Sequence, residues 1–234
     1  MKRSVKAIIL AVVLCLELIA PKTKSYAVAI QHVLYNNGTI QKDGYFYQVW
    51  ADKGGSRMTI YADGSFECNW DRICNAEFIK GKKFGSTQNA LQAGNINVSY
   101  DVTFKPGGND FMCVHGWMMN PLIEYFVVDN WGAWRPNYGV LMARYNINGG
   151  LYDLYVQQVH NLPSPAGNNT TFKRYWLVRQ DKISWNSYNL YNCFNAFKNR
   201  NLPLGNLYSV EFLVNAYQSA GSVKVNSFDI RGNK

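Results

Sequence analysis

The sequence contains few of the residues that usually build metal and redox sites. It has three histidines and five cysteines in 234 residues. Cys68 and Cys74 are six positions apart and have no histidine nearby, which fits none of the common zinc motifs. We therefore expect no metal site.

The sequence also lacks a concentrated basic stripe. Removal of residues 1–27 would take away five bases and one acid and lower the formal charge from +9 to +5. The remaining bases are scattered along the chain, whereas nucleic-acid binding requires a basic surface on a readable element. We therefore exclude nucleic acid as a partner.

One long apolar run occurs at the amino terminus, and it is short for a membrane span. Three basic residues precede the mostly apolar stretch 7–20, and Ser25-Tyr26-Ala27 provides a small-x-small cleavage site. This pattern is typical of a secretory signal. We predict a signal peptide over 1–27, a secreted protein and no membrane association after cleavage; a retained signal anchor is the alternative.

Four cysteines remain after cleavage, and export would permit disulfides. Four cysteines allow three pairings, and the sequence does not choose among them. The residues are Cys68, Cys74, Cys113 and Cys193.

The body of the chain, residues 28–234, has no internal repeats or low-complexity linkers, so we predict one domain. Short strand-like runs alternate with turn signals such as Ala62-Asp63-Gly64. Such spacing indicates an all-β fold of two packed antiparallel sheets. The predicted strands cover 45–50, 57–61, 65–70, 97–104, 111–117 and 208–215.

One helix is predicted, over about 187–199. Leu190, Phe194 and Phe197 fall at i, i+4 and i+7 and form an apolar stripe, with Asn186 or Ser187 as the cap. We expect this stripe to pack in the core.

Glu124 lies inside a β-branched and aromatic run, 123–129, that is predicted to be a strand. Successive side chains on a strand point to opposite faces, so Glu124 shares a face with Phe126, while Tyr125 takes the other. A carboxylate among apolar neighbours is costly to bury unless it is paired or used. Glu124 is therefore a candidate for chemistry in a cleft; a solvated strand-end carboxylate is the plainer alternative.

Aromatic residues make up 15% of the sequence, and Asn and Gln are frequent. Flat aromatic rings stack on the apolar faces of sugars while amides bind the hydroxyls, so this composition indicates a carbohydrate groove. The alternative is that most rings form the core. The rings considered are Trp50, Tyr125, Trp131, Tyr155 and Trp176.

Two long runs resemble the family 11 glycoside hydrolases, the small endo-1,4-β-xylanases. They are PLIEYFVVDNWGAWRP at 121–136 and YDLYVQQVHNLPSPAGNNTTFKRYWLVRQDK at 152–182, and the similarity extends from about Gly44 to Asp229. The resemblance implies a β jelly roll of two strongly curved antiparallel sheets, one of which lines a long cleft. It also implies a monomer that binds β-1,4-xylan without a cofactor.

By this resemblance Glu124 is the catalytic nucleophile. Retaining hydrolysis needs a second carboxyl about 5–5.5 Å away as acid and base. The family has a glutamate in a VEGYQSSG-like run, whereas the matching run here, 214–221, holds Asn215 at that position. A side-chain amide cannot donate the proton, so the resemblance predicts weak or lost hydrolysis.

Other positions are assigned to the substrate groove by the same resemblance. Trp50 matches a tryptophan that stacks on a distal xylose, and the segment around Pro163 matches the thumb hairpin. Four positions in this groove depart from the family: His115 and Phe126 stand where it has tyrosines, Val159 stands where it has an arginine, and Arg174 stands where it has a glutamine. The predicted substrate-binding residues are Trp50, His115, Tyr125, Phe126, Pro163 and Arg174.

The sequence also offers a candidate replacement for the missing acid, Glu77. Family members have a polar residue bonded to the acid/base glutamate, and either Asn75 or Glu77 matches it. Three hypotheses follow: a xylan-binding protein with weak or lost hydrolysis, a working xylanase that uses Glu124 and Glu77, and a non-catalytic decoy or structural protein.

Overall fold

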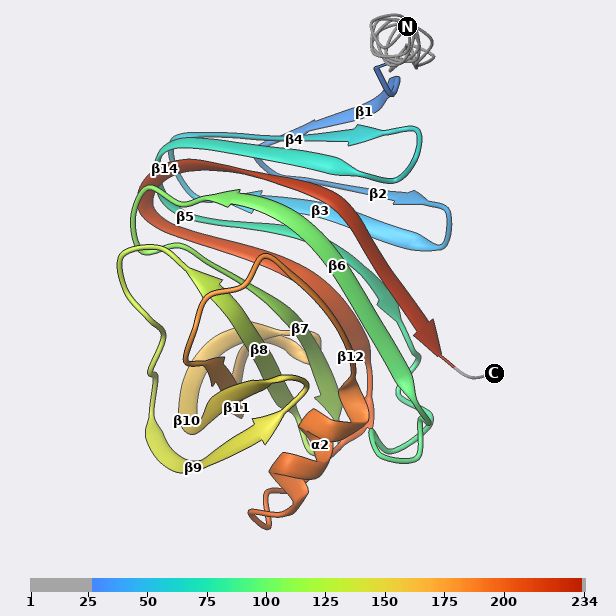
Figure 1. The fold of residues 1–234 in the computed structure, drawn as a ribbon, viewed down its shortest axis with the longest axis vertical. Helices are drawn as coiled ribbons and strands as arrows, with labels where there is room; N and C mark the ends of the chain where they lie inside the picture. Colours follow the sequence, from blue (N-terminus) through green and yellow to red (C-terminus); the bar gives the residue numbers. More distant parts are fainter. Residues whose placement is uncertain (1–26, 233–234) are drawn as a thin grey trace, which may run out of the picture.

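The computed structural model describes residues 27–232, so the predicted signal peptide lies outside the described residues apart from Ala27. The described chain is mostly strand, as predicted, with one helix (Figure 1). The elements are β1 Ile30–Tyr35, β2 Gly38–Lys42, β3 Tyr45–Ala51, β4 Gly55–Tyr61, β5 Phe66–Lys83, β6 Ile96–Lys105, β7 Phe111–Met119, β8 Ile123–Trp131, β9 Val140–Ile147, β10 Gly150–Ser164, β11 Gly167–Arg179, β12 Trp185–Asn189, α2 Leu190–Lys198, β13 Asn206–Leu207 and β14 Ser209–Gly232.

The strands form one continuous ladder that is folded into two layers (Figure 1). Its main order is β1-β4-β5-β14-β7-β8-β11-β10-β9. The inner layer contains β2, β3 and β7 to β11, and the outer layer contains β1, β4, β6 and β12. The long strands β5 and β14 belong to both layers, because β5 pairs first with β4 and then with β3, and β14 pairs first with β7 and then with β6. The predicted jelly roll is confirmed, with its two layers joined by these strands.

Strand β14 bends between the layers near Ser219. Its register against β5 shifts between Ser219 and Gly221. A Cβ atom at Gly221 would lie 2.6 Å from the Trp70 ring and 2.8 Å from the carbonyl oxygen of Lys105, so only glycine fits. Such a bulge bends a strand and increases its twist, which allows β14 to continue from one layer into the other.

The two faces of β8 contribute to different clusters. Tyr125 and Val127 join the core between the layers, whereas Phe126 and Val128 join a second cluster that faces the cleft. The alternation predicted for 123–129 is therefore confirmed. It fixes the direction of Glu124, which lies on the face of Phe126.

Helix α2 starts later than predicted. Its first residue is Leu190, and the side chain of Asn189 accepts a 2.9 Å hydrogen bond from the backbone N–H of Tyr191. The predicted start at 187 and the predicted caps are wrong, because residues 185–189 pair with β6 as strand β12. Ladder hydrogen bonds and the burial of Tyr188 outweigh local helix signals there.

The predicted apolar stripe of α2 is buried and packs beneath the inner layer. The Phe194 ring lies 5.3 Å from that of Tyr125, and the Phe197 ring lies 5.1 Å from that of Tyr175. The helix has nine residues, and no helix within residues 27–232 is long and apolar enough to cross a bilayer.

The four cysteines in the described part of the chain are all unpaired. Cys68, Cys113 and Cys193 are buried, and Cys74 is half-buried. The sequence permitted disulfides, but this structure contains none among residues 27–232, and the size of the buried core makes such crosslinks unnecessary.

Candidate active site

A cleft follows the inner layer on the face opposite to the core. It consists of two adjoining cavities of about 600 and 540 Å³. Asn75, Glu77, Glu124 and Arg174 line both cavities and therefore mark the centre of the cleft.

Glu124 points into this centre from β8 and is 6% exposed. Its Oε1 lies 3.0 Å from Nε2 of His115, and its Oε2 accepts a 2.5 Å bond from Nε of Arg174. The two partners come from the neighbouring strands β7 and β11. Both oxygens of the predicted nucleophile are therefore engaged by nitrogen donors.

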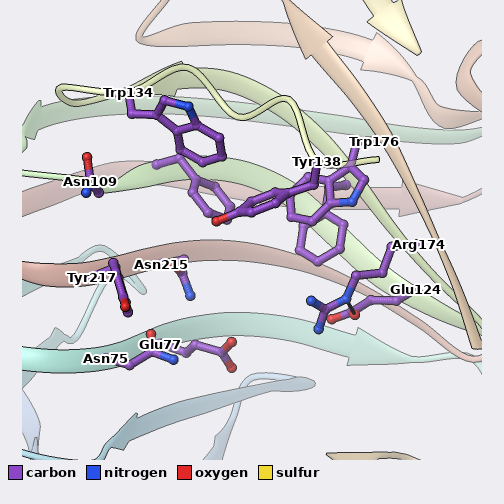
Figure 2. A pocket seen from close by; sticks show the side chains of 12 residues that line it. Asn75, Glu77, Asn109, Glu124, Trp134, Tyr138, Arg174, Trp176, Asn215 and Tyr217 are labelled. Carbon is purple, nitrogen blue, oxygen red and sulfur yellow. Dashed lines mark hydrogen bonds and ion pairs between the residues drawn. The ribbon is translucent and has the colours of Figure 1, made fainter. Parts of the chain in front are cut away.

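Arg174 is held opposite Glu124 by the parallel pairing of β11 with β8. Its guanidinium carbon lies 5.9 Å from the centre of the Phe126 ring and 5.7 Å from that of Phe172, within the range of cation–π attraction. These contacts fix the charge beside the Glu124 carboxylate (Figure 2).

His115 links Glu124 to a second carboxylate. Its Nδ1 lies 2.7 Å from Oε2 of Glu211, which comes from the directly opposite position on β14. All three residues are buried. The sequence assigned His115 to the substrate groove, at a position that departs from the family, and it gave no sign of this bridge.

The two carboxylates decide the protonation of His115. Burial opposes a charged imidazole, but the hydrogen bonds that His115 donates to Glu124 and Glu211 outweigh it and raise the pKa of His115 from 6.5 to about 10. Burial would also raise the pKa of Glu211, but the hydrogen bond from His115 lowers it below its ordinary value. At neutral pH His115 is therefore an imidazolium that donates from both nitrogens.

Glu77 and Asn215 are direct neighbours on the floor of the cleft. The pairing of β5 with β14 sets Asn215 opposite Glu77, and β3 sets Trp50 on the other side of Glu77. In Figure 2 the Glu77 side chain points along the floor toward the ion pair of Glu124 and Arg174. Asn215 lines the first cavity only.

The environment of Glu77 favours its protonated form. Burial is the largest cause of its raised pKa, and the nearby charges of Glu124 and Glu211 raise it further, against the lowering effect of His115 and Arg174. A carboxyl with a raised pKa beside a carboxylate that is held by two cations is the arrangement that separates an acid from a nucleophile.

One arm of the cleft contains Trp50 and the tip of the β10–β11 hairpin. Trp50 is 40% exposed, and it lines the second cavity together with Pro163. The hairpin tip is fixed by Ser164, whose hydroxyl accepts bonds from the N–H of Ala166 at 3.0 Å and from the Thr170 hydroxyl at 2.8 Å. This arm thus has an exposed ring facing a rigid tip.

The other arm is built from aromatic rings. Phe126 and Trp176 stack in parallel, with their centroids 3.7 Å apart, and Tyr138 lies 5.1 Å from Trp176. Trp176 is only 2% exposed, so it supports the wall more than it offers a free surface. Four further residues that line this arm were not predicted from the sequence, and they are Asn109, Trp134, Tyr138 and Tyr217. Trp134 and Tyr217 lie inside runs that carry the resemblance, so the sequence held a signal for these two.

Tyr125 does not lie in the cleft. It is fully buried in the core between the layers, and its hydroxyl donates to the carbonyl of Ser209 at 2.9 Å. The prediction that Tyr125 binds substrate is therefore wrong, because strand alternation sends it away from Glu124. Trp131 is 8% exposed and packs in the cleft-facing cluster with Phe126 and Val128.

Solved structures share this fold. The structure of the family 11 xylanase from Neocallimastix patriciarum aligns with a TM-score of 0.80 and 26% identity, covering 86% of this chain and all of that one. The wild-type ENZbleach xylanase aligns with a TM-score of 0.79 at 22% identity, which supports the fold alone.

Sequence comparisons lead to the same family. Endo-1,4-beta-xylanase A of Bacillus pumilus is 41% identical over 190 residues, which are 81% of this chain and 82% of that protein. The bifunctional xylanase/deacetylase of Pseudobutyrivibrio xylanivorans is also 41% identical, over 89% of this chain, but the chain spans only about a third (35%) of its length. The family model described as Glycosyl hydrolases family 11 matches residues 42–226, and the chain therefore belongs to glycosyl hydrolase family 11.

Proposed function

We propose that the protein is a retaining hydrolase of β-1,4-xylan in which Glu124 is the nucleophile and Glu77 is the acid and base. The observation that carries this proposal is that Glu77, with a raised pKa, lines the same cleft centre as the ion-paired Glu124. Xylan is the substrate named for the related xylanases of this family.

The first step follows from the two carboxyl groups. An oxygen of Glu124 attacks the anomeric carbon, the bond to the leaving sugar oxygen breaks, and the Glu77 proton moves to that oxygen. In the second step Glu77 takes a proton from water, the water oxygen attacks the anomeric carbon, and Glu124 is released as a carboxylate. Asn215 is the ladder partner of Glu77 on the adjacent strand, and its side-chain amide is uncharged.

The cleft arms support binding of a chain-like glycan. Trp50 offers an exposed ring on one side, and Tyr138 and Tyr217 are about 40% exposed on the other. Rings of this kind stack on sugar faces. The proposal also includes export after cleavage near Ala27, a single domain over 28–234 and a monomeric state.

A second candidate function is xylan binding with weak or lost hydrolysis. The observation in its favour is that both oxygens of Glu124 already bind cations, His115 and Arg174, which lowers the reactivity of the carboxylate. Asn215 at the family's acid position favours the same outcome.

Release of reducing sugar from xylan distinguishes the two functions. We expect turnover by the wild type and a loss of roughly 100- to 10,000-fold in Glu77→Gln. An aryl xylobioside with a good leaving group should be less sensitive to this substitution in the first step. Turnover that is absent in the wild type but appears in Asn215→Glu would instead support binding with lost hydrolysis.

A further inference from the structure

A buried series of three ionisable groups runs from Glu211 through His115 to Glu124. The imidazole nitrogens lie 2.7 Å from Glu211 and 3.0 Å from Glu124, and each of the three side chains is at most 8% exposed. The site chemistry described above uses only Glu124. Glu211 lines the second cavity of the cleft, and its carboxylate is bonded to His115 at 2.7 Å.

The number of N–H groups that the His115 imidazole must donate indicates the role of Glu211. An ionised carboxylate only accepts hydrogen bonds, and a neutral imidazole donates from one nitrogen. His115 faces a carboxylate oxygen at each nitrogen, so both bonds form only when the ring carries two protons. With Glu124 as the only partner, a neutral imidazole would suffice.

The surroundings of His115 leave these two carboxylates as its dominant partners. Phe126 lies 4.8 Å and Trp117 lies 6.2 Å from the ring centre, and they shield it from solvent. Four strands place charged or titratable groups near His115 or its two carboxylate partners. These groups are Glu77 and Lys83 on β5, Glu124 on β8, Arg174 on β11 and Glu211 on β14.

We propose that Glu211 is a positioning residue which keeps His115 doubly protonated, so that the His115 N–H group stays on Oε1 of Glu124 throughout the reaction. This inference rests on the proposed function. It assigns to Glu211 a role that acts only through His115.

The need for Glu211 is greatest at the covalent intermediate. When Glu124 bonds to the anomeric carbon it loses its negative charge, and His115 then faces a neutral ester. The Glu211 carboxylate still holds the proton on the imidazole. When the ester bond breaks, its electron pair returns to Glu124, and the N–H groups of His115 and Arg174 stabilise the carboxylate that leaves.

The kinetic test is Glu211→Gln, with Glu67→Gln as the control. Glu67 is on β5, the strand that pairs with β14, and it forms an ion pair with Lys224 outside the cleft. We expect release of the sugar from Glu124 to slow by roughly 10- to 100-fold in Glu211→Gln. Glycosylated protein should then accumulate with an aryl xylobioside, and the alkaline limit of the rate profile should move to lower pH. An unchanged pH profile and no accumulation would overturn the proposal.

The second test measures His115 directly by nitrogen NMR in the whole protein. The chain has three histidines, so His32→Gln and His160→Gln assign the signals. We expect both His115 nitrogens to stay protonated in the wild type up to about pH 9, and one to lose its proton near neutral pH in Glu211→Gln. A neutral His115 in the wild type would overturn the proposal, even if the variant fails to fold. If the expected titration is found but xylan is not hydrolysed, the proposed function fails and the positioning of Glu124 stands.

Discussion

Strand β8 carries two buried carboxylates that point in opposite directions. Glu124 faces the cleft at 6% exposure and is bonded by two cationic side chains. Asp129 is fully buried between the layers, where the hydroxyls of Tyr100 and Tyr152 donate to it. The same strand therefore supplies one carboxylate that lines the cleft and a second carboxylate that lies inside the core.

The buried carboxylates in the core and in the cleft differ in the hydrogen-bond donors that they bind, which are neutral hydroxyls in the core and cationic groups in the cleft. Burial raises the pKa of Asp129, because the tyrosine hydroxyls and the nearby Arg179 only partly offset the loss of water. In the cleft cluster, the hydrogen bond from the His115 imidazolium overcomes burial and lowers the pKa of Glu211. A cationic donor thus keeps the buried Glu211 carboxylate ionised, whereas the neutral donors of Asp129 leave its pKa raised.

The largest expected effect is the loss of activity in Glu124→Gln. An amide is a poor nucleophile, so xylan hydrolysis should fall by roughly 10,000-fold or more while the fold is kept. Reducing-sugar release measures the change, with Glu67→Gln as the control of equal chemistry. Retention of about a hundredth of the wild-type rate would mean that another group attacks the sugar.

Asp129→Asn should show the opposite behaviour. The amide offers one acceptor oxygen to two tyrosine hydroxyls, so one buried hydroxyl loses its partner. We expect a loss of about 1–3 kcal/mol in the free energy of unfolding, measured by urea denaturation. Activity per folded molecule should be unchanged. A variant of wild-type stability but reduced activity would contradict the structural role of Asp129.

The stability of the protein should fall as pH rises through the alkaline range. Because the folded pKa of His115 is raised to about 10, its contribution is complete below about 6.5 and is lost progressively as pH approaches 10. The slope is at most about 1.4 kcal/mol per pH unit. Glu211, with a lowered pKa, contributes above its ordinary value of 4.5 and loses that contribution as pH falls through its folded pKa. Denaturation at a series of pH values should show a weaker alkaline decline in His115→Gln.

The smallest expected effect concerns the exposed ring of the cleft. Trp50→Ala removes a stacking surface and should weaken binding of a short xylo-oligosaccharide by about 10-fold. Trp185 is 72% exposed on the outer layer, and Trp185→Ala is the matched control. Calorimetric titration measures both. Equal losses in the two variants would place the oligosaccharide outside the cleft.

The local sequence pattern was sufficient to predict the direction of side chains on β8, where the two faces of the strand contact different clusters. The alternation in 123–129 gave the directions of Glu124 and Phe126, and it also contradicted the assignment of Tyr125 to the substrate groove. The start of α2 could not be predicted in this way, because strand pairing with β6 extends residues 185–189. That partner strand lies about 90 residues earlier in the chain, where no local signal reports it.

The sequence by itself determined the all-β class, the resemblance to one family, the helix stripe and the identity of Glu124 as the central carboxylate. Only the tertiary structure decided which groups surround that carboxylate. Glu77, His115, Arg174 and Glu211 come from four strands, and their meeting depends on ladder register. A shift of one residue in any pairing would turn a side chain to the opposite face, so the charge balance of the site is a property of the folded sheet.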